Sequence, residues 1–389
     1  MVAGHACVDV LPAIMHPGPL TFEPGTLTVV GPASISAGGC VPNTGLALRR
    51  LGLRVRLIGR VGSDPFGAIL IKLLSDIEPG LAADLVVVPG DLTSYSIIVS
   101  PPGSDRMFLH FPGANESFAA EDVSDQRLQG ARILHVGYLP LLREMYDRGG
   151  SGLIRLLDRA KTAGLATSMD MSYPDLASYP SPVDWREVLA GALPYVDFFL
   201  PSLDELHLML AAEPAPRPID PETVRRLADE VLRLGAAVVG IKLGEHGFYM
   251  RSAREAVVAR STSAVPIRVS EWSTRELWST AFEADTVATT GAGDAAVAGF
   301  LLGLLRGMTP EETITAAAAV GASSVEQQET LGGVVGWEAI AARLSQGWPR
   351  TEANFGRGWK ELQRGMWAGP GDQRLSPSAG PPRPLSRPR

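Results

Sequence analysis

The chain has 389 residues, of which 45% are hydrophobic, and a formal net charge of −7. It can bury a large core, and its acidic balance argues against a nucleic acid or an anionic membrane as the partner of the main body. Its two cysteines exclude a disulfide framework and favour a reducing, cytoplasmic compartment, and no apolar run approaches the roughly 20 residues of a membrane span.

The N-terminal segment predicts a short buried strand over residues 2–10. This strand ends near Asp9, and open α/β sheets place ligand contacts at the ends of their strands. A turn-forming Asp before Pro12 explains the same residue equally well. Asp9 is therefore a candidate ligand contact with a structural alternative.

Two segments without a helical period indicate short strands outside the main sheet. Residues 11–37 are rich in Pro, Gly, Thr and Val. Within 92–112, the predicted strands 94–99 and 107–111 flank a Pro-Pro-Gly-Ser-Asp turn, which is typical of a β-hairpin. Together the two segments predict a small separate sheet.

A pair of glycines opens the first predicted helix. Gly38 and Gly39 precede apolar residues that recur at spacings of three and four, and Gly52 suits the C-terminal cap of the helix. Asn43 lies near the start of this helix. Its amide could bind a polyol, although capping the helix is the usual role of Asn there.

From residue 131 onward the chain alternates short apolar strands with longer helical segments. This alternation predicts a doubly wound α/β fold, with a mostly parallel sheet covered by helices on both faces. The predicted strands are 132–136, 166–169, 196–200 and 237–242, and the predicted helices are 151–163, 184–192, 221–234, 311–325 and 337–345.

The segment Thr289-Thr290-Gly291-Ala292-Gly293-Asp294 leads directly into an apolar helix. The first N–H groups of a helix lack partners inside it, and the helix dipole adds partial positive charge there. Gly291 and Gly293 have no Cβ, so a phosphate can approach these amides closely. Asp294 would repel that phosphate, but its carboxylate makes sense beside a hydroxyl that attacks the phosphate. The loop therefore predicts a phosphoryl-transfer centre.

Two other interpretations of this loop remain open. A plain helix cap with Asp in the first turn needs no ligand. A dinucleotide fingerprint, Gly291-x-Gly293-x-x-Ala296, needs a buried strand before its first glycine, and residues 283–288 form a poor one. The loop alone does not separate phosphoryl transfer from a helix cap.

The composition changes beyond residue 348. Residues 349–389 are rich in Pro, Gly, Ser and Arg, and they carry more basic than acidic side chains. Such a segment buries too little apolar surface to order itself, so we predict one folded domain over 1–348 and a disordered basic tail over 349–389. Trp359 and Trp367 leave open that part of the tail docks on the body.

With the glycine pair and the Gly-Ala-Gly-Asp loop both placed, residues 2–345 resemble the ribokinase-like (PfkB) carbohydrate kinases. Two motifs carry the resemblance, and their order and wide separation make them more specific together than either is alone. The resemblance implies a doubly wound α/β body with a small β-sheet lid from 11–37 and 92–112, and phosphorylation of a sugar hydroxyl with ATP and Mg²⁺. The motifs are Gly38-Gly39…Asn43…Leu51-Gly52…Gly59-x-x-Gly62-x-Asp64-x-Phe66-Gly67 and Thr290-Gly291-Ala292-Gly293-Asp294-Ala295.

The resemblance also implies roles at the reaction centre. Asp294 resembles the catalytic base of these kinases, and the amides of Gly291, Ala292 and Gly293 resemble their anion hole. Four further residues match positions that hold the sugar hydroxyls: Asp9, Gly38, Gly39 and Asn43.

On the nucleotide side, Lys242 and Gly244 match the end of the strand that lies against ATP. Glu205 matches the glutamate of an Asn-x-x-Glu motif associated with Mg²⁺ and phosphate. Ser202 replaces the Asn of that motif, so its direct contact with phosphate or water is in question.

Two more departures from the family pattern bear on activity. Ala288 stands where potassium-activated members carry a carboxylate, so we expect weak or absent potassium activation. Asp170-Met171-Ser172-Tyr173 lacks the Arg that many sugar-acid and fructose kinases carry at this place, which weakens the case for an anionic substrate.

In the implied mechanism the sugar hydroxyl hydrogen-bonds to Asp294, and lid closure excludes water. We expect the helix N-terminus to lower the pKa of Asp294. The alternatives are a nucleoside kinase on the same scaffold and a non-catalytic ligand-binding member. An exposed lid sheet would also suit a homodimer through the lid.

Overall fold

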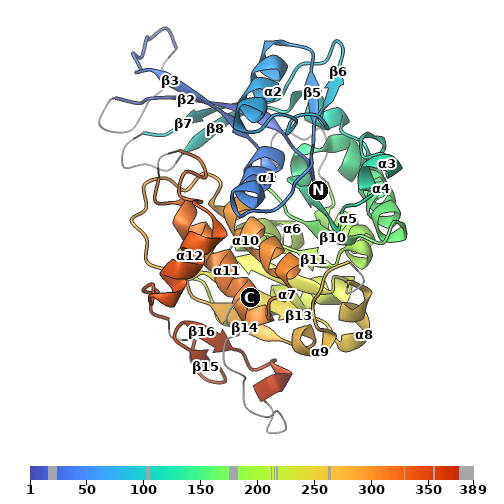
Figure 1. Cartoon of the computed structure of the whole chain (residues 1–389), viewed down its shortest axis with the longest axis vertical. Helices are drawn as coiled ribbons and strands as arrows, with labels where there is room; N and C mark the ends of the chain where they lie inside the picture. Colours follow the sequence, from blue (N-terminus) through green and yellow to red (C-terminus); the bar gives the residue numbers. More distant parts are fainter. Residues whose placement is uncertain are drawn as a thin grey trace.

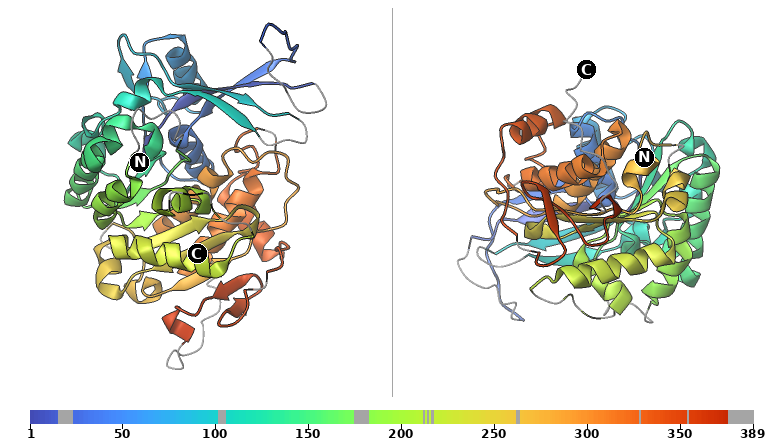
Figure 2. Two further views of the ribbon diagram at one scale, coloured as in Figure 1. Left: turned by 180° about the vertical axis from the view of Figure 1, so that it is seen from behind. Right: turned by 90° about the horizontal axis from the view of Figure 1, so that it is seen from below.

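The computed structural model describes the chain except for residues 16–23, 102–105, 175–182, 212, 214, 216–217, 262–263, 328, 354 and 376–389. The described residues form a large ten-stranded sheet and, apart from it, a four-stranded sheet (Figure 1). Helices lie on both faces of the large sheet (Figure 2), as the sequence predicts. In the described part of the chain, no helix has the length and apolar character needed to cross a lipid bilayer.

The large sheet has a parallel half and an antiparallel half. The parallel half contains, in spatial order, β4 (Leu57–Ile58), β1 (Val2–Gly4), β9 (Ile133–Gly137), β10 (Ala166–Met169), β11 (Phe198–Phe199) and β12 (Val238–Lys242). The antiparallel half continues with β13 (Phe248–Ser252), β14 (Glu276–Ser279), β16 (Met366–Ala368) and β15 (Lys360–Gln363). The parallel half is the predicted doubly wound core.

Two hydrophobic clusters, one on each face, hold the helices to this sheet. One face carries α1 (Cys40–Arg50), α10 (Ala292–Arg306) and α11 (Pro310–Ser324), and the other carries α4 (Arg143–Thr162), α5 (Trp185–Ala192), α6 (Leu203–Ala211) and α7 (Pro221–Leu234). Outside the large sheet, these helices and the small sheet, the described α-helices and strands are α2 (Pro65–Ile77), α3 (Asp125–Leu128), α8 (Glu255–Val258), α9 (Val269–Trp272), α12 (Trp337–Ser345), β5 (Arg60–Gly62) and β6 (Val86–Val88).

The small sheet confirms the predicted hairpin but corrects the first predicted strand. Its order is β3 (Ala33–Gly38), β2 (Cys7–Pro12), β7 (Tyr95–Val99) and β8 (Met107–Phe111), and β7 and β8 are antiparallel. A single strand over 2–10 is wrong, because β1 ends at Gly4 in the large sheet and β2 starts at Cys7 in the small one. Asp9 therefore lies within the small sheet rather than at the end of a large-sheet strand.

The predicted disordered tail is also wrong for its described part, which extends to residue 375. Here β15 and β16 extend the large sheet beyond β14, as the red segment in Figure 1 shows. Aromatic rings explain this docking, since Trp278 lies 4.6 Å from Phe355 and 5.8 Å from Trp359, centroid to centroid. Residues 376–389 lie outside the described residues.

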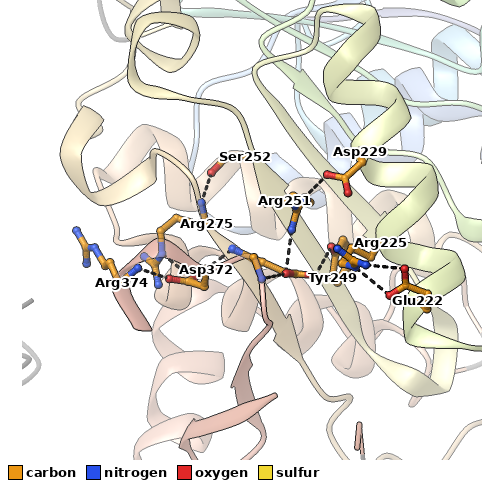
Figure 3. A network of polar contacts seen from close by, with 11 residues as sticks. Glu222, Arg225, Asp229, Tyr249, Arg251, Ser252, Arg275, Asp372 and Arg374 are labelled. Atoms are coloured by element: carbon orange, nitrogen blue, oxygen red, sulfur yellow. Dashed lines mark hydrogen bonds and ion pairs between the residues drawn. The ribbon is translucent and has the colours of Figure 1, made fainter. Parts of the chain in front are cut away.

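A buried polar network fastens the same extension (Figure 3). Asp372 accepts a hydrogen bond from Arg275 Nε at 2.9 Å and another from the Glu276 backbone N–H at 3.2 Å. Glu276 in turn pairs with Arg251 at 2.9 Å and accepts from the Tyr249 hydroxyl at 3.0 Å. These buried charges have oppositely charged partners, so the network stabilises the docked extension.

Candidate active site

Two cavities meet where the carboxyl ends of the parallel strands face the small sheet. The larger, of about 810 Å³, is lined by residues of the small sheet and of the body, Asp9 and Asn43 among them. The smaller, of about 450 Å³, lies beside Lys242 and Gly244 at the end of β12. The Tyr138 side chain borders both cavities. Two ligands can therefore bind next to each other.

Asp294 lies at this junction, in the first turn of α10, and only 1% of its surface is exposed. Its Oδ2 accepts hydrogen bonds from Asn43 Nδ2 at 3.1 Å and from the Tyr138 hydroxyl at 2.7 Å. Its Oδ1 accepts from Thr44 Oγ1 at 3.0 Å. The structure thus brings Asp294 and Asn43 together and adds Thr44 and Tyr138.

The sequence predicts a lowered pKa for Asp294, because the residue lies at a helix N-terminus, and this prediction is wrong. Burial raises the pKa of Asp294 above its usual value, and the hydrogen bond from Tyr138, the charge of Lys242 and the hydrogen bond from Thr44 offset only part of this rise. Removing the carboxylate from water outweighs the helix dipole, because desolvation penalises the charged form directly. A raised pKa makes Asp294 a stronger base than the sequence suggests.

The loop before Asp294 presents two free amides. Gly291 caps α10 in the left-handed conformation (φ 78°), which favours glycine. Among the described residues, the N–H groups of Gly291 and Gly293 have no acceptor, whereas the Ala292 N–H donates to Thr289 O at 3.3 Å. Of the three predicted anion-hole amides, two are therefore available and that of Ala292 is already engaged.

The Asp9 carboxylate packs against Gly38, and the His5 ring packs against Gly39. A Cβ on Gly38 would come within 2.1 Å of Asp9 Oδ2, so only glycine fits there. Gly39 has φ 85°, and its Cβ would lie 2.4 Å from His5 Nδ1. Burial raises the pKa of Asp9 to about 6. The glycine pair leaves room for one acid and one imidazole beside the larger cavity.

His5 and Tyr138 are cavity residues that the motifs do not indicate. His5 is 2% exposed, and neither of its ring nitrogens has a hydrogen-bond partner among the described residues. Burial lowers its pKa well below the usual value, so the ring is neutral and can both donate and accept. The ring lies 5.8 Å from that of Tyr138 and 5.2 Å from that of His110. These rings form one polar wall of the larger cavity.

Lys242 projects into the smaller cavity amid several acids. Its Nζ lies 2.5 Å from Asp170 Oδ1 and 4.0 Å from Glu205 Oε2. Burial acts to lower the pKa of Lys242, but the neighbouring carboxylates outweigh it and raise the pKa, so the ammonium stays charged. Burial also raises the pKa of Asp170 to about 8, against the opposing effect of Lys242. The cluster holds more acids than bases.

Ser202 and Glu205 cap α6 reciprocally. The Ser202 N–H donates to Glu205 Oε2 at 2.6 Å, and the Glu205 N–H donates to Ser202 Oγ at 3.3 Å. This capping box gives Ser202 a structural role that explains the residue without a ligand. Both residues line the smaller cavity, as do Lys242 and Gly244, whereas Gly38 and Ala292 border neither cavity directly.

The donor set of the smaller cavity fits magnesium that arrives with a nucleotide. The described residues contain no group of three or more His, Cys, Asp or Glu side chains placed to hold a metal ion by themselves. Mg²⁺ usually keeps several waters and is held by one or two carboxylates together with substrate phosphates. Glu205 supplies one such carboxylate at the cavity wall.

Comparison with known proteins identifies the family of this chain. The model of the pfkB family of carbohydrate kinases matches residues 13–334. The chain is 25% identical to an uncharacterized sugar kinase of Archaeoglobus fulgidus (69% of this chain, 89% of the relative) and 25% identical to 2-dehydro-3-deoxygluconokinase of Bacillus subtilis (83% and 91%). The ribokinase of Arabidopsis thaliana, solved with ribose and ATP, shares the fold with a TM-score of 0.68 at 21% identity (88% and 97%). The chain therefore belongs to the pfkB family of carbohydrate kinases and is an ATP-dependent sugar kinase.

Proposed function

We propose that this kinase transfers the γ-phosphoryl group of ATP to a hydroxyl of a small sugar or polyol, with Asp294 as the base. The observation that carries the proposal is the position of Asp294, a buried acid between two cavities and beside the free amides of Gly291 and Gly293. In the transfer the sugar oxygen bonds to the γ-phosphorus, the bond to ADP breaks, and the hydroxyl proton passes to Asp294.

The smaller cavity suits the phosphates. The Gly291 and Gly293 N–H groups at the start of α10 would stabilise charge on the transferring group, as in an oxyanion hole. Lys242 supplies a permanent positive charge at the end of β12, and Gly244 leaves open space beside it. Glu205 would hold Mg²⁺, which neutralises phosphate charge when bound.

The larger cavity suits the sugar. Asp9 and Asn43 offer hydrogen-bonding groups to its hydroxyls, and the neutral His5 ring can donate or accept. The small sheet that carries Asp9 borders this cavity and would exclude water as a lid.

The outer face of the small sheet suits a second copy of the chain. It exposes apolar side chains of β3 and β8, with Ile35 46% and Leu109 57% exposed. A homodimer would cover this face and its sheet edges.

The free, buried Cys7 and Cys40 support a reducing, cytoplasmic compartment.

The test is ADP release from ATP·Mg²⁺ in the presence of ribose, fructose, 2-dehydro-3-deoxygluconate and adenosine, with phosphorylated products identified by mass spectrometry. We expect at least one sugar to yield ADP and sugar phosphate in equal amounts. Transfer to adenosine alone would favour a nucleoside kinase. Binding of ATP without transfer to any acceptor would favour a non-catalytic ligand-binding protein.

A further inference from the structure

The shortest hydrogen bond to Asp294 comes from a residue outside the family motifs. The Tyr138 hydroxyl donates to Asp294 Oδ2 at 2.7 Å, against 3.1 Å for Asn43 and 3.0 Å for Thr44. Asn43 and Thr44 both come from the buried N-terminal half of α1, whereas Tyr138 directly follows β9. Tyr138 is therefore the one of these three donors that does not come from α1.

The backbone of Tyr138 is held in place for this contact. Its φ and ψ of 59° and 46° are left-handed, a conformation that favours glycine and that other residues keep mainly at functional sites. The preceding Gly137 packs against α1 so closely that a Cβ would lie 1.8 Å from Cys40 Sγ. On the other side the ring stacks on His5 with an interplanar angle of 27°. The position of the hydroxyl is thus set by the fold.

With Asn43 and Tyr138 in place, Asp294 Oδ2 has no lone pair left for an acceptor hydroxyl. Oδ2 already accepts two hydrogen bonds and Oδ1 one, and the residue is 1% exposed. Thr44 is fully buried and Asn43 is 4% exposed in α1, so neither can leave easily. The Tyr138 side chain is half-buried and borders both cavities. Of the three donors, it is the most exposed.

We propose that the Tyr138 hydroxyl holds the place of the acceptor hydroxyl at Asp294 and keeps water from that place until a sugar displaces it. The inference rests on the proposed function. Tyr138 is a positioning residue, because it acts through Asp294 and contacts none of the reacting atoms once displaced. The reaction it suppresses is hydrolysis, in which a water oxygen bonds to the γ-phosphorus, the bond to ADP breaks, and the water proton passes to Asp294.

The electrostatics of the site agree with this role. Burial, followed by the charge of Asp294, raises the pKa of the Tyr138 phenol well above its usual value, so the hydroxyl remains a donor. The hydrogen bond from Tyr138 acts to lower the pKa of Asp294. The other titratable groups that interact with Asp294 are Lys242, Asp170, Asp9, Cys7 and Cys40. Loss of the phenol hydroxyl therefore raises the pKa of Asp294 further.

The experiment compares wild type, Tyr138→Phe and the control Tyr95→Phe. Tyr95 lies on β7 of the small sheet, its ring stacks on Phe66 of α2, and it lines neither cavity. ADP release from ATP·Mg²⁺ is measured without sugar and with the best sugar of the panel, and kcat/KM is followed from pH 5 to 9. Tyr138→Phe keeps the ring and its packing, so it tests the hydroxyl alone.

We expect Tyr138→Phe to raise sugar-independent ADP release at least fivefold and to move the acid limb of kcat/KM to higher pH, while Tyr95→Phe matches wild type. Unchanged ADP release overturns the place-holding role, even if the acid limb moves, because only an electrostatic contact then remains. If wild type shows no sugar-dependent ADP release, the proposed function fails and this inference fails with it.

Discussion

Two buried clusters of charged side chains in this protein differ in how completely their charges are paired. In the C-terminal network, Arg251 and Arg275 are matched by acids that include Glu276 and Asp372. At the cavity junction, the charge of Lys242 favours the ionised form of Asp294, while the carboxyl groups of Asp170 and Asp9 oppose it. In the first cluster each of these acids contacts an arginine, whereas Asp294 and Asp9 form no ion pair among the described residues.

This difference separates a structural cluster from a reactive one. A buried charge without a partner is costly, so a fold keeps it only where function needs it. In the C-terminal network the paired charges hold the extension to β14. At the junction, burial raises the pKa values of Asp9, Asp170 and Asp294.

The largest expected effect is on turnover at the reactive cluster. Asp294→Asn removes the base and should lower kcat by about 10²–10⁴-fold. ATP affinity should change less than about twofold, because the Gly291 and Gly293 amides and Lys242 are untouched. Steady-state kinetics and calorimetric titration with ATP measure the two quantities. Near-normal turnover in this variant would refute the assignment of Asp294.

In the C-terminal network, a substitution should change the stability of the protein rather than its turnover. Asp372→Asn removes a carboxylate that accepts from Arg275 and from the Glu276 N–H, and it should lower the free energy of unfolding by about 2–4 kcal/mol. Chemical denaturation measures this change, and kcat should stay at the wild-type level. Asp76→Asn is the matched control, since the exposed pair of Asp76 with Lys72 contributes less than about 0.5 kcal/mol.

Substitution of Asp9 should raise the free energy of unfolding, whereas substitution of Asp372 should lower it. Burial raises its folded pKa to about 6, so the folded state binds a proton first as the pH falls. The ionised Asp9 carboxylate therefore lowers the free energy of unfolding above pH 6. This destabilisation disappears as the pH falls from about 6 towards 4. Asp9→Asn should stabilise the protein at pH 7 by up to about 3 kcal/mol, since a tenfold change in proton affinity is worth about 1.4 kcal/mol.

Denaturation of wild type and Asp9→Asn at pH 4.5 and pH 7 checks this prediction. The difference between them should be large at pH 7 and small at pH 4.5, and the variant should bind sugar more weakly. A loss of stability of Asp9→Asn at pH 7 would contradict this prediction, because the Asp9 carboxylate would then have partners as favourable as those of Asp372.

The smallest expected effect concerns monovalent cations. Since Ala288 has no carboxylate, we expect no potassium site beside the loop before Gly291. Replacing sodium with potassium should change kcat by less than about twofold. A strong activation by potassium would show that other groups supply the cation site.

The sequence predicted features that depend on local patterns. The helix over 221–234 has the predicted bounds, because its amphipathic face lies between an Asp220 cap and Gly235. The loop before Asp294 was predicted for a similar reason, since two glycines before an apolar helix have a direct conformational meaning. Local chemistry was sufficient in both cases.

Features that depend on distant partners could not be predicted. Tyr138 meets Asp294 across 156 residues of sequence, and no local pattern marks that pairing. The raised pKa of Asp294 comes from burial that only the assembled fold creates. Trp359 leaves docking of the tail open, but the composition of residues 349–389 does not show that its ring packs against Trp278 of β14.

The most direct test of the comparison is the free energy of unfolding of Asp294→Asn, measured beside Asp372→Asn at pH 7. Because burial raises the pKa of Asp294, a neutral side chain suits the fold better there, and we predict that Asp294→Asn unfolds at higher denaturant than wild type while Asp372→Asn unfolds at lower. Equal losses of stability in both variants would contradict the account, because the two clusters would then be structural alike.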